Sequence, residues 1–150
     1  MSAERCIRGV MLAGGAWFLL AGAWAFSDPG SFYEHVAHFP PYNRHFLHDA
    51  GAFQLGLGTA LMLGMAGWDG RRVVLWAVAV ASALHAVSHI VDRDLGGRGT
   101  DPIVLSLVAA AFVVAAVLAS RTRRERTDHA ATPPVVGVRA DRSERAPQPH

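Results

Sequence analysis

Six ionisable side chains form two short clusters at the ends of two successive apolar segments. One cluster opens the apolar segment that begins near residue 45, and the other closes the next apolar segment near residue 90. Their members are His45, His48, Asp49, His85, His89 and Asp92. Ionisable groups within or at the edge of a membrane are costly to keep there, so they are candidate functional residues.

Imidazole and carboxylate groups with this spacing could bind a transition metal. His45 with Asp49, and His85 with His89, are four residues apart, so each pair shares one face of a helix. Two such pairs on facing helices can make a tetrahedral site. Mixed ligands of this kind suit zinc, iron, manganese or copper, and the two remaining members, His48 and Asp92, would orient the ligands or join them. This is our leading hypothesis for the site.

Two other interpretations use the same residues. In the first, carboxylates and imidazoles hydrogen-bond only to each other and lock the helices, as in a non-enzymatic structural or accessory membrane subunit. In the second, the cluster relays protons, binds a quinone-type headgroup or, as a variant, holds haem between two histidines. The sequence leaves all three open, and it does not decide whether the protein is an enzyme.

Four apolar blocks must position these residues. We expect membrane-spanning helices at about residues 7–26, 44–67, 72–93 and 102–120, because each block nearly spans a hydrocarbon core of about 30 Å. Backbone groups in lipid must bond within their own segment, which favours helices. The chain is 51% hydrophobic, and its first and last blocks lack the polar stripes of a soluble bundle. The expected fold class is all-α, an integral membrane four-helix bundle over residues 1–120.

The arginines predict the orientation. All 14 basic residues are arginine, and most lie before the first block, between the second and third, and after the fourth. The opposite side has three, Arg44, Arg93 and Arg98. Positive residues mark the cytoplasmic side. We therefore expect a multi-pass protein of the cytoplasmic membrane with both termini in the cytoplasm. Its expected partners are the lipid bilayer and either a second copy or another membrane protein, and no nucleic acid.

The connections carry helix-start signals. Asp28 can cap a short interfacial helix over about 29–38, with Pro29 in its first position. Asn43 can cap the second span, and Asp101 can cap the fourth. The segment 121–150 is rich in arginine and proline with few large apolar residues, so we expect a disordered cytoplasmic tail.

The second and third spans should form a hairpin that brings the two clusters to one level. With a turn near residues 69–70, the numbers of antiparallel neighbours add to about 139. In the second span the cluster shares its face with Ala52, Gly56 and Ala60. Small residues let membrane helices approach closely, so we expect this polar face to point at protein rather than lipid.

The segment from Asn43 to Gly58, NRHFLHDAGAFQLGLG, runs from a polar start into a glycine-rich helix with a Gly-x-Gly. This entry to the second span resembles that of small four-helix bacterial membrane proteins of the DoxX-like type and related domains of unknown function. The resemblance covers about residues 5–120 in layout and this segment in detail. It implies a four-helix fold and transfers no catalytic residue.

Overall fold

The structure, a computed structural model, describes residues 3–66 and 68–131, with side chains placed except at 68–69 and 123–131. Within these residues it consists of five helices without a strand, which confirms the all-α prediction. The helices are α1 (Ala3–Ser27), α2 (Pro29–His35), α3 (Arg44–Ala66), α4 (Trp68–Val91) and α5 (Asp101–Ala131).

Three of the four long helices are long and apolar enough to cross a membrane. They are α1, α4 from Gly70 to Val91, and α5 from Asp101 to Thr122. Only 28% of each apolar window is buried, so most of this apolar surface faces outward. We expected four such spans. Helix α3 is 23 residues long, but Gln54, Thr59 and its glycines lower its apolarity.

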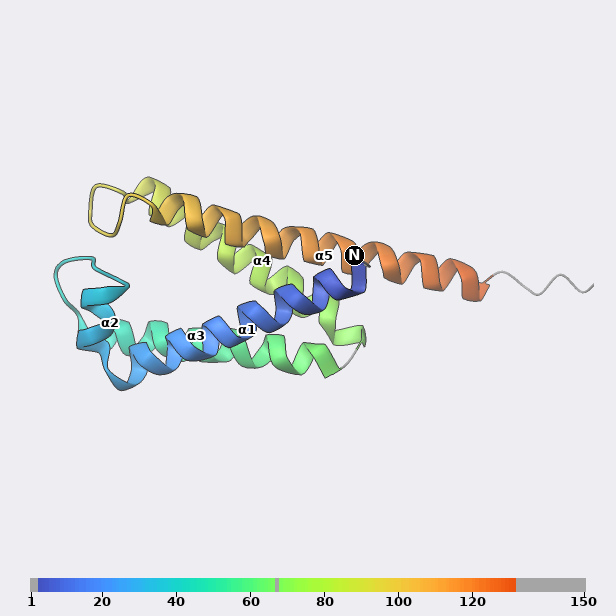
Figure 1. The fold of residues 1–150 in the computed structure, drawn as a ribbon, viewed down its shortest axis with the longest axis horizontal. Helices are drawn as coiled ribbons and strands as arrows, with labels where there is room; N and C mark the ends of the chain where they lie inside the picture. The colour runs from blue at the N-terminus through green and yellow to red at the C-terminus, as the bar shows by residue number, and fades with distance from the viewer. Residues whose placement is uncertain (1–2, 67, 132–150) are drawn as a thin grey trace, which may run out of the picture.

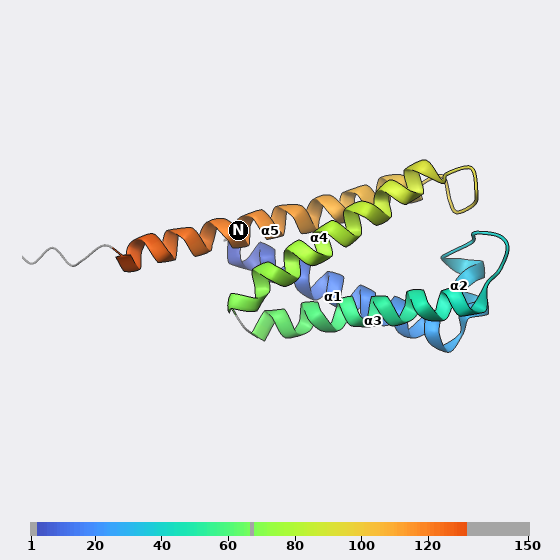
Figure 2. The same cartoon turned by 180° about the vertical axis from the view of Figure 1, so that it is seen from behind.

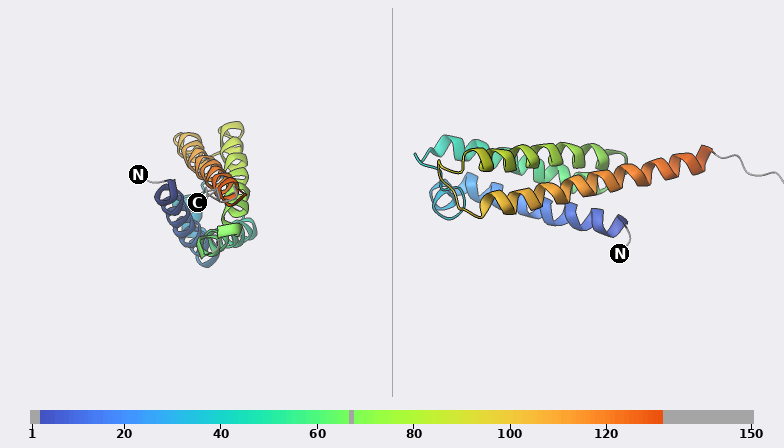
Figure 3. Two further views of the ribbon diagram at one scale, coloured as in Figure 1. Left: turned by 90° about the vertical axis from the view of Figure 1, so that its right-hand side faces the viewer. Right: turned by 90° about the horizontal axis from the view of Figure 1, so that it is seen from above.

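The four long helices form two antiparallel pairs that meet at one end and diverge toward the other (Figures 1 and 2). Helix α1 packs mainly against α3, and α4 mainly against α5. We call the end with the start of α1 and the α3–α4 turn the arginine-rich end, because Arg5, Arg8, Arg71, Arg72 and Arg121 lie there. The opposite end, with α2 and the loop 92–100, is the α2 end. The left view of Figure 3 shows the same four helices end-on.

Glycines bring α1 and α3 into backbone contact. A Cβ added to Gly22 would lie 2.8 Å from the carbonyl oxygen of Gly51, and one added to Gly58 would lie 3.0 Å from that of Gly15. The glycines are seven residues apart on each helix, so both pairs fall on one interface. Small residues are typical of closely packed membrane helices.

The small-residue face of α3 that we predicted to pack is largely exposed. Ala52 and Gly56 are exposed, and nothing lies within 4 Å of a Cβ at Gly56. The packed face carries Gly51 and Gly58 instead. Glycine has no side chain, so the face with glycine at both contact points permits a closer approach than a face that includes alanine.

Two buried clusters stabilise the fold, and they differ in which helices they join. The cluster toward the arginine-rich end draws on all four long helices, with members that include Ile7, Met11, Leu61, Leu75, Val78 and Phe112. The cluster at the α2 end joins only α1, α2 and α3 and consists of Ala21, Ala25, Phe32 and Leu47. Packing therefore ties the two helix pairs together at the arginine-rich end.

Loop contacts connect the pairs at the α2 end. The Gly97 amide donates to the carbonyl oxygen of His38 at 2.8 Å, and the Arg98 guanidinium donates to that of His35. The Phe39 ring meets the His89 ring edge-on at 5.2 Å. Gly97 has a positive φ of 78°, and a Cβ there would lie 2.8 Å from the Phe39 ring. We use the term clasp for three of these contacts: Gly97 with His38, Arg98 with His35, and Phe39 with His89.

The capping predictions had mixed outcomes. Asp28 Oδ1 accepts a hydrogen bond from the Ser31 amide at 3.2 Å, as predicted for the start of α2. Asn43 Oδ1 accepts from the Phe46 amide at 3.1 Å, as predicted for α3. Helix α5 continues past the expected end near residue 120 to Ala131, and the remainder of the predicted tail, 132–150, lies outside the described residues.

Candidate functional site at the α2 end

Two of the three α3 members of the proposed set, His45 and Asp49, pair within their own helix and face outward, whereas His48 contacts α1. His45 Nε2 lies 3.5 Å from Asp49 Oδ2, one helical turn on, with the two side chains 87% and 57% exposed. His48 stacks at an angle on Phe26 of α1, with ring centroids 5.1 Å apart. The high exposure shows that His45 and Asp49 point away from the other helices.

The α4 members form a second group. The rings of His85 and His89 lie 4.8 Å apart at a steep angle. Asp92 ends the helix, because its amide donates to the Ser88 carbonyl at 2.8 Å while its own carbonyl accepts from Leu95 at 2.9 Å. His89 is well covered, with 15% of its side chain exposed.

Asp101 also belongs to this second group, although its sequence pattern did not predict it there. Its Oδ2 lies 3.9 Å from His89 Nδ1 and accepts a hydrogen bond from the Arg98 amide at 2.7 Å. We expected this carboxylate to cap α5, but Thr100 supplies the carbonyl that Ile103 and Val104 bond. The Asp-Pro signal marked the helix start correctly and gave no sign that the carboxylate turns back to α4.

The two groups do not converge. Near the turn the register is as expected, since a Cβ on Gly64 would lie 3.4 Å from Val74, and these numbers add to 138. Beyond that point α3 follows α1 while α4 follows α5, so the helices separate (Figures 1 and 2). Among residues 3–66 and 68–131, no three His, Cys, Asp or Glu side chains are grouped to hold a metal ion. The expected centre from six residues is therefore not formed in this arrangement, and the residues do not fit it.

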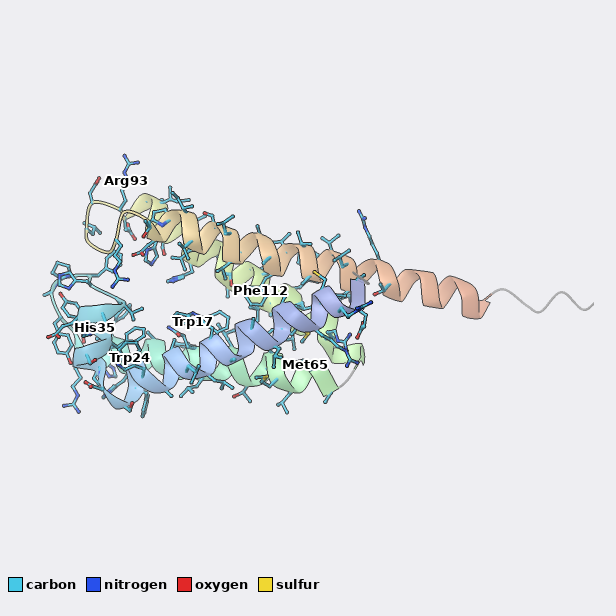
Figure 4. All side chains as sticks on the ribbon, in the orientation of Figure 1. Trp17, Trp24, His35, Met65, Arg93 and Phe112 are labelled. Carbon is cyan, nitrogen blue, oxygen red and sulfur yellow. The ribbon has the colours of Figure 1, made fainter. Side chains whose placement is uncertain are left out.

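A cavity of about 240 Å³ lies beside His89, at the α2 end. It is lined by Arg93, Asp94, Arg98, Pro102 and the glycines of the 96–99 loop. Figure 4 shows Arg93 on the α4–α5 side of this end and His35 on the α2 side. Arg93 Nε lies 3.8 Å from Asp94 Oδ1, and Arg98 is engaged in the clasp. Because these charges already have partners, we assign the cavity no ligand.

No protein-family model, curated protein or solved structure matches this chain at a significant level. The resemblance to DoxX-like proteins therefore stays a prediction. What the protein does has to be inferred from its own side chains.

Proposed function

We propose that the chain is a multi-pass protein of the cytoplasmic membrane, in which α1, α4 and α5 span the bilayer and α3 crosses it with them as the fourth helix of the bundle. Three helices of sufficient length and apolarity support this placement, as does their largely outward-facing apolar surface. The arginines gathered at one end favour that end, with both termini, as the cytoplasmic side. The outward apolar surface suits lipid and a second copy or membrane partner.

Within this protein His89 and Asp101 act as a helix lock, so the chain serves as a non-enzymatic structural or accessory subunit. The observation that carries this is the position of His89. Its imidazole faces the Asp101 carboxylate of α5 at 3.9 Å and the Phe39 ring at 5.2 Å. One side chain of α4 thereby contacts both α5 and the loop that follows α2. Polar groups that pair in this way fix helix ends without a bound cofactor.

Substitution of His89 tests the lock. We expect His89→Ala to lower the free energy of unfolding by about 1–2 kcal/mol, because it removes a covered polar pair and a ring contact together. His45→Ala is the matched control, since its pair on α3 is exposed and should contribute roughly 0.5 kcal/mol or less. Both values come from SDS unfolding of detergent-purified protein. Equal effects of the two substitutions would refute the lock.

Extraction of the protein from membranes by carbonate without detergent would refute the membrane placement.

Metal binding is the second candidate, and the approach of His85 to His89 favours it. Imidazole is a ligand type that suits zinc or iron, and these two lie one helical turn apart, although within the described residues they do not form a complete three-ligand group with a carboxylate. Metal analysis of the same purified protein decides between the candidates. Stoichiometric metal that is lost in His85→Ala would establish this function in place of the lock, and its absence would remove it.

A further inference from the structure

Helix α3 carries a continuous stripe of exposed residues on the side that does not pack against α1. Neighbouring members are four and three residues apart in turn, so they follow one line along the helix, as the contact residues of paired helices do. The stripe lies across the helix from Gly51 and Gly58, which contact α1, and Figure 2 shows α3 in front of α1. We call these exposed residues the α3 seam: His45, Asp49, Ala52, Gly56, Thr59 and Leu63.

The middle of the α3 seam differs from the outward surface of the other long helices. Leu20 of α1 and Leu107 of α5 are 70% and 67% exposed, and large apolar side chains of this kind suit lipid. The middle of the seam consists of Ala52, Gly56 and Thr59. Small residues are enriched where membrane helices pack against each other. The seam therefore matches the surface of another helix better than it matches acyl chains.

Gly56 gives an independent reason to expect a helix on this side. A Cβ added to Gly51 or to Gly58 would lie 2.9 Å from backbone or carbonyl atoms of α1, so both glycines are needed for that contact. Within residues 3–66 and 68–131, nothing lies within 4 Å of a Cβ at Gly56. Glycine is a poor helix former, and no contact within the chain requires it at this position. A second close helix on the outer side of α3 would require it.

The charges of the seam select a second copy of the chain as that partner. His45 and Asp49 lie one turn apart, and both side chains are exposed. The imidazole is a hydrogen-bond donor to the carboxylate and, when protonated, its counter-charge. Copies inserted in the same direction have parallel α3 helices, and a two-fold axis brings each seam against itself at equal depth.

In such a parallel pair, each seam residue fits between residues of adjacent turns on the other helix. His45 of each copy thereby reaches Asp49 of the other copy, and the face is complementary to itself in charge. An unrelated helix would need an opposite pair at the same depth and in the same order.

We propose that the α3 seam is the interface of a symmetric homodimer, in which two copies lie side by side in the bilayer with parallel α3 helices. Gly56 lies at the centre, where the two backbones approach most closely. His45 and Asp49 of both copies pair at the α2 end of the interface. The proposal identifies the membrane partner of the proposed function, so it rests on the membrane placement but not on the His89 lock.

Disulfide cross-linking in membranes tests the interface, with single cysteines introduced into a Cys6→Ser chain. We expect Ala52→Cys and Gly56→Cys to form a covalent dimer under a mild oxidant, because each position meets its own counterpart. Val80→Cys is the matched control, since Val80 is 56% exposed on α4. It should yield about fivefold less dimer, because its outward side faces lipid.

A bulky residue at the centre should separate the copies without unfolding the chain. We expect Gly56→Leu to reduce cross-linking through Ala52→Cys about fivefold, because its side chain occupies the space where the helices meet. The Tm of the variant in detergent should not fall, since the space around Gly56 is open within one copy.

A charge exchange tests the polar end of the seam. His45→Asp places a carboxylate opposite the other copy's Asp49 and should lower cross-linking about threefold. The exchanged variant His45→Asp/Asp49→His should restore it, because the opposite pairs form again. A double variant as weak as the single one would contradict the pairing across copies.

Three results would overturn the dimer: no cross-linked dimer from the seam positions, an equal yield from Val80→Cys, or cross-links from the seam to a different protein in place of a second copy. Carbonate extraction and the His89→Ala comparison are read separately. A chain that stays in the membrane and keeps the His89 effect, but forms no seam cross-links, would overturn this interface alone.

Discussion

Arg71 is a nearly buried cation that links two helices at the arginine-rich end. It is 3% exposed, and its Nη1 donates to Glu4 Oε1 at 2.7 Å, which joins the start of α4 to the start of α1. The same carboxylate oxygen accepts from Arg8 Nε at 2.8 Å. Arg8 is 60% exposed and lies one turn along α1. Two arginines thus share one acceptor in very different surroundings.

Removal of the shared carboxylate should separate the two contributions. We expect Glu4→Gln to lower the free energy of unfolding by about 2 kcal/mol, because the nearly buried Arg71 loses its ion pair with this carboxylate. Arg8→Gln should cost roughly 0.5 kcal/mol or less, as exposed pairs do. SDS titration in detergent measures both. In the double variant Glu4→Gln/Arg71→Met most of the loss should be recovered, and equal losses in the single and double variants would contradict this account.

At the scale of single residues, the sequence allowed the helix starts to be predicted and left most pairings undecided. Asp28 and Asn43 act on amides three residues away, so their partners follow from spacing alone. Asp101 has the same kind of signal, yet its carboxylate bonds outside its own helix. Its partner His89 is twelve residues earlier in the chain, and no local pattern encodes that contact.

The close packing of α1 against α3 depends on glycines, which have no side chain, at the points of contact. A Cβ added to Gly22 would lie 2.8 Å from the carbonyl oxygen of Gly51, and a Cβ added to Gly51 would lie 2.9 Å from the carbonyl oxygen of Gly22. Neither carbonyl can move without displacing a whole helix. Gly56, on the exposed side of α3, meets nothing within 4 Å. The same substitution should therefore have opposite effects at the two places.

Alanine at these positions tests the interface. We expect Gly22→Ala to lower the free energy of unfolding by about 2 kcal/mol, because α1 and α3 must separate. Gly56→Ala should leave it unchanged or raise it by up to about 1 kcal/mol, since alanine is the better helix former. Chemical unfolding of both variants in one detergent gives the comparison. A Gly22→Ala protein as stable as Gly56→Ala would show that the contact is not tight.

The choice of face on α3 shows why the sequence was insufficient here. Helix α3 carries two stripes of small residues at helical spacing. One consists of Ala52, Gly56 and Ala60, and the other of Gly51 and Gly58. Periodicity identifies two candidate faces, and only the partner helix decides between them. The glycines of α1 that complement Gly51 and Gly58 lie 29 and 43 residues away in the chain.

The whole molecule consists of two helix pairs joined by packing at the arginine-rich end and by loops at the α2 end. The hairpin register could be predicted from the turn, and Gly64 and Val74 confirm it locally. The divergence of α3 from α4 could not be predicted from the sequence. It arises because α3 packs mainly on α1 and α4 mainly on α5, in place of a full-length contact with each other. Antiparallel neighbours in sequence need not remain neighbours along their full length.

Weakening of the clasp should widen the α2 end alone. We expect Arg98→Ala to increase the distance between spin labels at the exposed positions Phe46 and Ile90, because the guanidinium contact with the α2 side is lost. Labels at Leu63 and Val73, near the α3–α4 turn, should not move. Pulsed electron resonance on cysteine variants in a Cys6→Ser background measures both distances. An unchanged Phe46–Ile90 distance would show that other contacts hold this end closed.

Helix α5 runs unbroken for 31 residues, from Asp101 to Ala131. At 1.5 Å per residue it is about 46 Å long, whereas the hydrocarbon layer it would cross is about 30 Å thick. In the proposed orientation the last 15 Å or so of the helix, about the excess over the hydrocarbon thickness, extends into the cytoplasm. Ala131, the last residue of α5, would then lie clear of the lipid headgroups.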